Sequence, residues 1–474
     1  MRYKSLLLLV STVLFFASCR KEDKFLEGGA ELKFSRDTVF FDTVFTKLNG
    51  SSYPRSINKQ FMLRNPHKES VRVNVKVMGG SISAFRINVD GRPGNNIPEV
   101  EIMPEDSAWV FVEASLEPNN LSNPAIVRDS IEFETNGTRQ YVQLAAYGWD
   151  AYYFKDTVFT GTTNLVLNDK PYVIVNSVFV DDNSTLNIGP GIHFYCSPNS
   201  TILSNNKLIN IAALNVFGTL KINGTKDNPV VFEGDRLGIE FSEMAGQWRG
   251  IRFWRGSVDN EIRHAYIKNS TVGIVVDSLP ESGTYNLIIR NTRIKNMSAY
   301  GVLGQTAKLY LENTSISNCG LYTFLGFYGG EYTLIHCSLY TGSNGRKDPH
   351  VLFNNSLRDE NKVLIRSYDL KHFIINSIIW GPLENEIGYS DLVAPPNPPI
   401  VTVINNSIYR SKNDLGGIGN KRNADPKFAD PGAGNLRLKS DSPAKDSADP
   451  NNSPPGDLED KPRNGTPDMG AYEL

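Results

Sequence analysis

A six-residue pattern that occurs six times between Ile262 and Ile408 constrains the fold more than any other feature of the sequence. Each copy has an aliphatic residue first, a polar marker residue third and a second aliphatic residue sixth. The markers are His264, Asn291, Asn313, His336, Asn376 and Asn405, with steps of 27, 22, 23, 40 and 29 residues between them. A basic spacing of 22 to 23 residues with insertions predicts a solenoid, because one such unit cannot bury its apolar residues without stacking on the next.

Each copy predicts two short strands joined by a sharp bend at the marker. Asn tolerates the left-handed backbone of such a bend, and stacked Asn side chains can form a hydrogen-bonded ladder. The position after the marker is occupied by small or short residues, which are Ala265, Thr292, Thr314, Cys337, Ser377 and Asn406. We therefore predict an all-β chain whose residues 151–424 form a right-handed parallel β-helix.

The repeats resemble those of the parallel β-helix proteins, a fold shared by pectate lyases, polygalacturonases and many non-enzymatic surface proteins. The resemblance covers residues from about 160 to 430, and the fold alone does not select one of these activities. The segments Asp425–Asp430, Asn435–Ala444 and Thr466–Glu473 resemble the terminal segment of choice-of-anchor Q proteins. This resemblance implies that residues 425–474 close the solenoid as a cap that wraps the last coils.

Residues 31–150 have a different pattern, in which apolar and polar residues alternate, as in Val71–Val77. Alternation with a period of two is typical of strands with one buried and one solvated face. A segment of this length with turns between such strands predicts an immunoglobulin-like β-sandwich. It lacks the Cys, Trp and Cys spacing of antibody domains, which excludes that particular kinship.

The N-terminus has the features of an export signal: a charged start, an apolar run from Leu6 to Phe16 and small residues before Cys19. The sequence up to Cys19 resembles the lipobox of bacterial lipoproteins. This resemblance implies a signal peptide over residues 1–18, lipidation of Cys19 and a tether over residues 19–30; an ordinary signal peptide with an incidental cysteine is the alternative. The residue after Cys19 is not Asp, and a charged run follows, which in this family points to the outer membrane and its outer face.

Composition excludes two other classes of protein. A net charge of -2 and a pI near 6.4 provide no positive field to attract nucleic acid. After the N-terminus, no apolar run is long enough to cross a membrane as a helix. The cysteines that remain, Cys196, Cys319 and Cys337, form no cluster with the spacing of metal ligands, so we predict no metal site.

The residue after each copy defines a possible outward column. These residues are Lys268, Lys295, Ser317, Tyr340, Trp380 and Tyr409. Aromatic rings stack on sugars and basic groups pair with uronates or sulfates, so we expect Tyr340, Trp380 and Tyr409, with Arg293 nearby, to bind a long acidic glycan. The alternative is a solvated strand face whose aromatic residues cover loops.

Catalysis would depend on the basic residues Lys268, Arg290 and Lys295. Resemblance to β-helix lyases of the chondroitinase type implies a basic residue that removes the proton beside a uronate carboxylate, with calcium held by carboxylates. Glu312 is the one acid in the six copies, so we expect calcium only if the protein is a lyase and otherwise no cofactor. A glycosidase needs two carboxyls roughly 5 to 9.5 Å apart, which the repeat does not offer, although loop carboxylates such as Glu386 could converge.

Three functional hypotheses follow from the sequence. The first is a non-catalytic, lipid-anchored outer-membrane protein whose β-helix binds a polysaccharide or a surface protein partner. The second is a polysaccharide lyase or glycoside hydrolase that acts on acidic glycans. The third is a structural or adhesive spacer; the oligomeric state stays open in all three.

Overall fold

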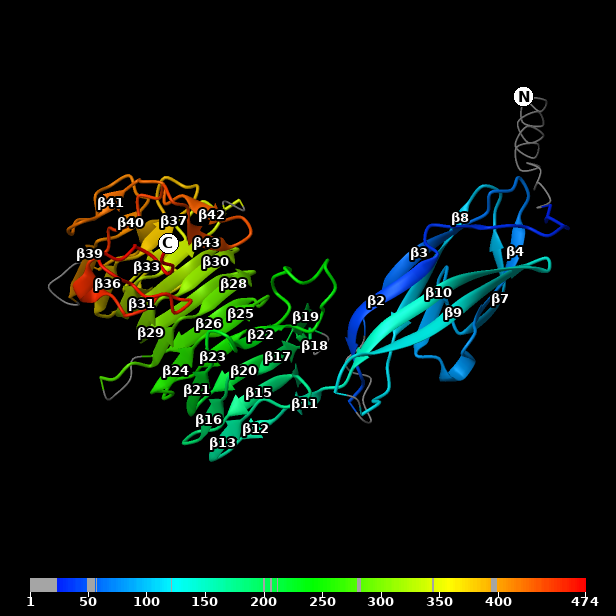
Figure 1. Cartoon of the computed structure of the whole chain (residues 1–474), viewed down its shortest axis with the longest axis horizontal. Helices are drawn as coiled ribbons and strands as arrows, with labels where there is room; N and C mark the ends of the chain where they lie inside the picture. Colours follow the sequence, from blue (N-terminus) through cyan, green and yellow to red (C-terminus); the bar gives the residue numbers. More distant parts are fainter. Residues whose placement is uncertain are drawn as a thin grey trace, which may run out of the picture. The chain divides into compact units, whose positions relative to one another are not determined.

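The computed structural model describes residues 24–48, 56, 58–120, 122–198, 201–204, 207–210, 212–278, 283–342, 345–393 and 399–474. The predicted signal peptide and Cys19 lie outside these residues. Contacts divide the chain into two units (Figure 1). One is formed mainly by residues before Trp149, and the other by Trp149–Leu474 with two short earlier segments.

The first unit is a sandwich of two five-stranded sheets. One sheet contains, in spatial order, β1 (Lys33–Phe34), β3 (Lys59–Arg64), β8 (Ser107–Ala114), β5 (Phe85–Val89) and β6 (Arg92–Pro93). The other contains β2 (Thr38–Phe45), β10 (Thr138–Trp149), β9 (Ala125–Thr135), β4 (Val71–Val77) and β7 (Asn96–Ile102). The four valines of β4 are fully buried and the residues between them are exposed, which confirms the predicted alternation.

The second unit is a parallel β-helix, as predicted, built from two large sheets. The 11-stranded sheet contains β11 (Tyr152–Lys155), β14 (Tyr172–Val175), β17 (His193–Cys196), β22 (Val230–Gly234), β25 (Ala265–Lys268), β28 (Arg293–Met297), β30 (Ser315–Cys319), β32 (Ser338–Tyr340), β37 (Ile378–Trp380), β40 (Ile408–Tyr409) and β41 (Lys421–Arg422). Neighbouring strands of this sheet pair in parallel from one coil to the next.

The 16-stranded sheet forms the other two sides of the coils. One side contains β12 (Val158–Phe159), β15 (Ser177–Val180), β20 (Ala213–Val216), β23 (Ile251–Phe253), β26 (Val272–Asp277), β33 (Val351–Phe353) and β38 (Ile387–Tyr389). The other contains β13 (Thr162–Leu165), β16 (Thr185–Ile188), β21 (Thr219–Asn223), β24 (Asn260–Arg263), β27 (Leu287–Arg290), β36 (Leu370–Ile375) and β39 (Ile400–Asn405). Two long strands, β29 (Tyr300–Glu312) and β31 (Tyr322–Ile335), belong to both sides and join them.

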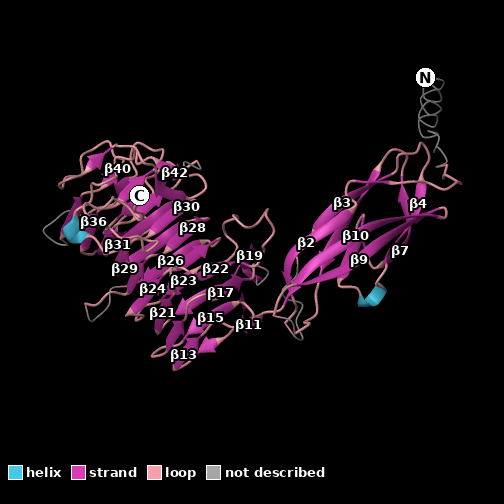
Figure 2. Ribbon diagram, in the orientation of Figure 1, coloured by secondary structure: helices cyan, strands magenta, loops and turns pink. Residues whose placement is uncertain are grey.

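Three two-stranded hairpins and two short turns complete the described elements (Figure 2). The hairpins are β18 (Thr201–Ser204) with β19 (Lys207–Asn210), β34 (Ser356–Arg358) with β35 (Leu364–Ser367), and β42 (Phe428–Asp430) with β43 (Asn435–Leu438). The 3-10 turns are η1 (Gly80–Ile82) and η2 (Pro450–Asn452).

The repeat sets the register of the coils. The first aliphatic positions pair in one buried column, formed by Ile262, Ile289, Leu311, Leu334, Ile374 and Ile404. The backbone at the corner that follows has a positive φ at His264, Asn291, Asn313, His336, Asn376 and Asn406. The predicted bend is therefore confirmed, and Asn tolerates this backbone better than most residues.

The sixth copy is one residue out of the predicted register. Ile374 pairs with Ile404, so Asn406 rather than Asn405 occupies the corner. Ser407 then takes the position of Ser377, whose backbone N–H donates to the Ser407 hydroxyl at 3.0 Å. The shift moves every later residue of this copy to the opposite side of its strand, since successive side chains alternate between the two faces.

The segment 425–474, which we call the C-terminal strap, packs along the outward face of the 11-stranded sheet. Its apolar residues Phe428, Leu436, Ala444, Met469, Ala471 and Tyr472 cluster with Ile378 and Ile408. It also bonds to the corners in succession: Asp449 contacts Asn376, Gly456 contacts Asn313 and Asp457 contacts Asn291. The strap thus runs back along several coils of the solenoid instead of adding only to its last turn.

Candidate functional site

The predicted outward column exists, but its last member is different. Strand pairing aligns Lys268, Lys295, Ser317, Tyr340 and Trp380 in consecutive coils. Because Ile379 pairs with Tyr409, the next residue in the column is Arg410, whose guanidinium lies 5.2 Å from the centre of the Trp380 ring. Tyr409 is 1% exposed and belongs to the apolar interior, so the expectation that it faces outward was wrong.

The aromatic half of the column lies against the strap. Tyr340 and Trp380 are half-buried and pack against the apolar cluster of the strap. The rings of Tyr340 and Phe428 meet edge to face with their centres 6.2 Å apart. Much of the surface of Tyr340 and Trp380 is therefore used in packing within the protein. The strap cluster covers the aromatic half of the column, and the lysines of the basic half are ion-paired and only 13% and 14% exposed.

The three basic residues proposed for catalysis do not come together. Arg290 ends β27 on a different side of the coil, where it pairs with Glu261 at 2.9 Å and Glu312 at 3.2 Å. Lys268 and Lys295 are neighbours on the 11-stranded sheet, where Lys268 pairs with Glu233 at 2.8 Å. Lys295 pairs with Glu243 at 2.5 Å. Of the three, only the two lysines lie side by side, and only Lys295 lines the pocket described next.

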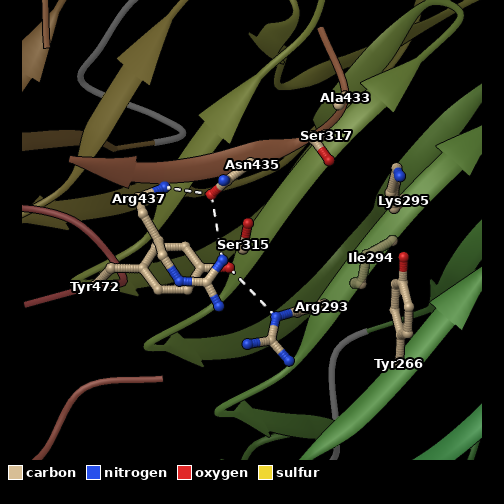
Figure 3. A pocket seen from close by; sticks show the side chains of 11 residues that line it. Tyr266, Arg293, Ile294, Lys295, Ser315, Ser317, Ala433, Asn435, Arg437 and Tyr472 are labelled. Carbon is tan, nitrogen blue, oxygen red and sulfur yellow. Dashed lines mark hydrogen bonds between the residues drawn. The ribbon is translucent and has the colours of Figure 1, made fainter. Parts of the chain in front are cut away.

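A pocket of 340 Å³ opens where the strap meets the basic half of the column (Figure 3). Sheet and strap both line it, with Tyr266, Arg293, Ile294, Lys295, Ser315 and Ser317 from the sheet and Ala433, Gly434, Asn435, Arg437 and Tyr472 from the strap. Cations, hydroxyl groups and one amide line this pocket. Such a set of donors suits a ligand with negative charge and many hydroxyl groups.

A glycine lets the strap close one end of the pocket. Gly434 has a φ of 74°, a conformation that L side chains rarely adopt. A β-carbon at this position would also lie 2.8 Å from the Ser317 hydroxyl and 3.0 Å from the Lys295 side chain. The turn at Gly434 therefore brings the backbone of the strap close to the lysine without filling the pocket.

Two arginines of the pocket share one carboxylate of the strap. Arg293 Nη2 donates to Glu459 Oε1 at 2.6 Å, and Arg293 Nε donates to the Tyr472 hydroxyl at 3.3 Å. Arg437 Nε donates to Glu459 Oε2 at 3.2 Å, and its Nη2 also pairs with Oε1. The two guanidinium groups are thereby arranged around a single anionic position.

In the pocket, Tyr266 stays neutral and Arg293 stays positively charged. Burial raises the pKa of Tyr266 to about 12, and the nearby Glu243 adds to this shift, so the phenol stays neutral and can donate a hydrogen bond. Burial lowers the pKa of Arg293, but Tyr472 and Glu459 outweigh it, so the net shift is upward. Arg293 therefore remains a cation in its half-buried position.

A smaller pocket of 170 Å³ lies on the other side of Arg293. It is lined by Thr225, Lys226, Asp227, Pro229, His264, Ala265, Asn291, Arg293, Leu458 and Glu459. Arg293 lines both pockets. Glu459 lines the smaller pocket and accepts a hydrogen bond from Arg437, which lines the larger one. The ion pair of Arg293 and Glu459 therefore lies between the two pockets, at the edge of the strap.

The charged insertion between His336 and Asn376 forms a buried ion pair. Arg346 donates to Glu386 through Nη1 at 2.9 Å and Nη2 at 3.1 Å, and neither side chain is more than 2% exposed. The loop carboxylate Glu386 thus binds an arginine inside the protein. Among the described residues, no group of three or more His, Cys, Asp or Glu side chains is placed to hold a metal ion.

The sequence identified the sheet side of the pocket but not the strap side. Arg293, Lys295 and Lys268 could be found because the repeat places them in columns. Arg437, Glu459 and Tyr472 follow them by more than 130 residues and belong to an irregular segment with no periodicity. Only the three-dimensional path of the strap shows that they meet.

No family model and no curated protein matches the sequence. Solved structures that resemble part of it include a PapD-like domain of human CEP192, with 10% identity, a TM-score of 0.20, and coverage of 26% of this chain and 88% of that one. A family 123 glycoside hydrolase from Clostridium perfringens has 11% identity, a TM-score of 0.20, and coverage of 27% and 26%. The CooA pilin subunit of enterotoxigenic Escherichia coli has 10% identity, a TM-score of 0.18, and coverage of 25% and 97%. These similarities are too low to support a functional assignment. In the part of the chain that the structure describes, no helix is long and apolar enough to cross a membrane.

Proposed function

We propose that the protein binds acidic polysaccharide, without turnover, in the 340 Å³ pocket between sheet and strap. The observation that carries the proposal is the set of cations that line this pocket, Arg293, Lys295 and Arg437, together with the rings of Tyr266 and Tyr472. Arginine pairs with carboxylates and sulfates through two parallel hydrogen bonds, and aromatic rings pack on the apolar faces of sugars. A uronic acid or a sulfated sugar presents both kinds of group.

The most direct test is calorimetric titration of the full-length protein with trigalacturonate, a sulfated chondroitin tetrasaccharide and neutral maltotriose. Binding of the acidic sugars, and not of maltotriose, supports the proposal, and it should weaken as salt is added, because the cations are partly exposed. Lys295→Gln should weaken it by about tenfold, or about 1.4 kcal/mol. No binding of any acidic sugar would refute the proposal.

Lys308→Gln is the matched control. Lys308 pairs with Glu331 at 3.1 Å and is about as buried as Lys295, but it lies on β29, outside the pocket. Its replacement should leave binding unchanged. If incubation instead released unsaturated sugars and Lys295→Gln abolished this release, a lyase would replace the binding protein.

We further propose that the protein is an outer-membrane lipoprotein held by lipid on Cys19, with a surface-exposed immunoglobulin-like sandwich and a strap of the choice-of-anchor Q type. The support is the sequence pattern before Cys19, since several acyl chains hold a protein on a membrane without a spanning helix. Metabolic labelling with an alkyne fatty acid tests this: the wild-type protein should be labelled and Cys19→Ser should not. A protein that takes up no label would contradict the anchor.

A further inference from the structure

Glu459 has an unusual position in the pocket region, because its carboxylate neutralises two arginines that the pocket would need for an acidic ligand. It accepts hydrogen bonds from Arg293 at 2.6 Å and from Arg437 at 3.2 Å. The side chains of Arg293, Glu459 and Arg437 are 35%, 31% and 48% exposed, so all three are accessible to a solute. The Glu459 carboxylate of the protein therefore already occupies the position that the acidic group of a ligand would take between the two arginines.

The side chain of Glu459 can leave this position without moving the strap. Its backbone N–H donates to Asp457 Oδ1 at 2.7 Å, and Asp457 also accepts from the backbone N–H groups of Lys461 and Glu473. Leu458, the preceding residue, is buried in the apolar cluster of the strap. The main chain is therefore fixed on both sides, and only rotation of the carboxylate is required.

The two pockets share Arg293, the residue whose guanidinium binds the Glu459 carboxylate. The larger pocket contains Arg437 and Lys295. The smaller contains Lys226 and His264 together with the acids Asp227 and Glu459, and Arg293 lines both. An acidic oligosaccharide that occupied both would cross Arg293, and its carboxylate would compete with Glu459 for the same donors. A single sugar can fill only one of them.

We propose that Glu459 is an internal substitute for the carboxylate of the ligand, and that the two pockets are halves of one groove for an acidic oligosaccharide of two or more sugars. Binding exchanges the Glu459 carboxylate for a uronate carboxylate on Arg293 and Arg437. Glu459 therefore lowers the affinity of the protein for the oligosaccharide, and a longer oligosaccharide binds more tightly. This inference depends on the proposed function, since it concerns the same pocket.

The experiment measures the affinity of full-length wild type and Glu459→Gln for mono-, di- and trigalacturonate by calorimetry. Glu459→Gln should tighten binding of the di- and trisaccharide by about fivefold, the factor that about 1 kcal/mol represents. Glu331→Gln is the control, because Glu331 is similarly exposed and pairs with Lys308 away from both pockets. Thermal unfolding of each variant shows whether the strap is still in place.

The outcomes separate the inference from the proposed function. If wild type binds trigalacturonate, Lys295→Gln weakens it and Glu459→Gln has no effect, the pocket binds the ligand but the inference is wrong. Equal affinity for one and three sugars would also overturn the single groove. If only Glu459→Gln binds, the inference is supported and the wild-type site is held closed by its own carboxylate. If neither binds, both proposals fail.

Discussion

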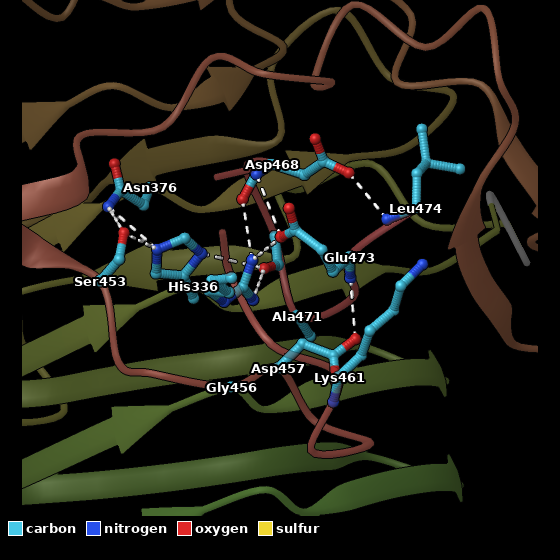
Figure 4. Close-up of polar contacts among 12 residues, drawn as sticks. His336, Asn376, Ser453, Gly456, Asp457, Lys461, Asp468, Ala471, Glu473 and Leu474 are labelled. Carbon is cyan, nitrogen blue, oxygen red and sulfur yellow. Dashed lines mark hydrogen bonds and ion pairs between the residues drawn. The ribbon is translucent and has the colours of Figure 1, made fainter. Parts of the chain in front are cut away.

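The buried guanidinium of Arg463 provides the sharpest test of how the strap is held. Its side chain is 0% exposed and makes four hydrogen bonds. Figure 4 shows two of its partners in the strap, Asp468 and Glu473. Nη1 donates to the Asp468 carbonyl at 3.1 Å and to Glu473 Oε2 at 2.7 Å; Nη2 donates to Asn313 Oδ1 at 3.2 Å and to the Gly470 carbonyl at 2.8 Å. One of these bonds joins the strap directly to a corner of the solenoid.

Replacing Arg463 by Met keeps a long apolar side chain but removes all four bonds and leaves the Glu473 carboxylate without its cation. Loss of one partner of a buried ion pair costs about 3 to 5 kcal/mol, and we expect about 3 because Glu473 is only partly buried. Burial already raises the pKa of Glu473, so in the variant this carboxyl should take up a proton readily. The loss of stability should therefore be smaller at pH 5 than at pH 8.

Hydrogen exchange measures this loss locally. The Gly470 N–H donates to the Asn376 carbonyl at 2.7 Å, and the Ala471 N–H donates to the Ser338 hydroxyl at 2.9 Å. About 3 kcal/mol should speed the exchange of both amides by about a hundredfold, with little change in the amides of β28. Lys461→Met, at an exposed position of the strap, is the control and should change exchange little. Protection of Gly470 within twofold of wild type in Arg463→Met would refute the argument.

Three further predictions concern the solenoid. Burial lowers the pKa of His350 to about 3 and that of His372 to about 4. Both are below the value of about 6.5 in an unfolded chain, so the unfolded state binds more protons at acidic pH. The contribution of the two neutral histidines to the free energy of unfolding should be fully present above about pH 6.5. It should decrease below that pH, by about 5 kcal/mol for the two together at pH 4.5. An unfolding midpoint in urea that does not change over this range would contradict this. Gly301→Ala should cost about 1 to 3 kcal/mol in denaturant unfolding, because the added carbon would lie 2.5 Å from both Ile316 Cγ2 and the Thr323 carbonyl; an unchanged midpoint would show that the coils can separate there. Tyr409→Ala should lower the free energy of unfolding by about 3 to 5 kcal/mol, more than Trp380→Ala does, because of the two only Tyr409 is fully buried. A larger loss in Trp380→Ala would instead support the register in which Tyr409 faces outward.

The fold was largely predictable from the sequence because the solenoid repeats one local rule. The aliphatic residues at Ile262, Ile289 and Ile374 fill the interior, and the Asn or His markers turn the corner. Each copy repeats this pattern with its own residues, so the prediction did not depend on any long-range contact. The alternation in Val71–Val77 identified the sandwich in the same way.

The sixth copy shows where a local rule is insufficient. Val403 and Ile404 are both aliphatic, and Asn405 and Asn406 are both suited to the corner, so the sequence allows two registers one residue apart. Pairing of Ile404 with Ile374 in the preceding coil selects one of them. A second column of corner residues, Asn296 and Asn318, was also missed, because these residues lie outside the six-residue pattern; Asn318 Nδ2 donates to Asn296 Oδ1 at 3.3 Å.

The strap half of the candidate site could not be derived from the sequence. Arg437 and Glu459 belong to an irregular segment whose path is fixed by many separate bonds to corners and strand faces, such as that between Asn313 and Gly456. No period relates these bonds to one another. The repeat therefore predicts the basic column of the sheet, but it cannot show that the strap covers the aromatic end of this column and completes a pocket at its basic end.

A crystal structure of the full-length protein with trigalacturonate tests the proposed site most directly. We predict that the sugar lies in the pocket between β28 and the strap, that a uronate carboxylate contacts Arg293 and Arg437, and that the Glu459 side chain has rotated away from them. Sugar bound at another surface, with Glu459 still on both arginines, would contradict the proposal.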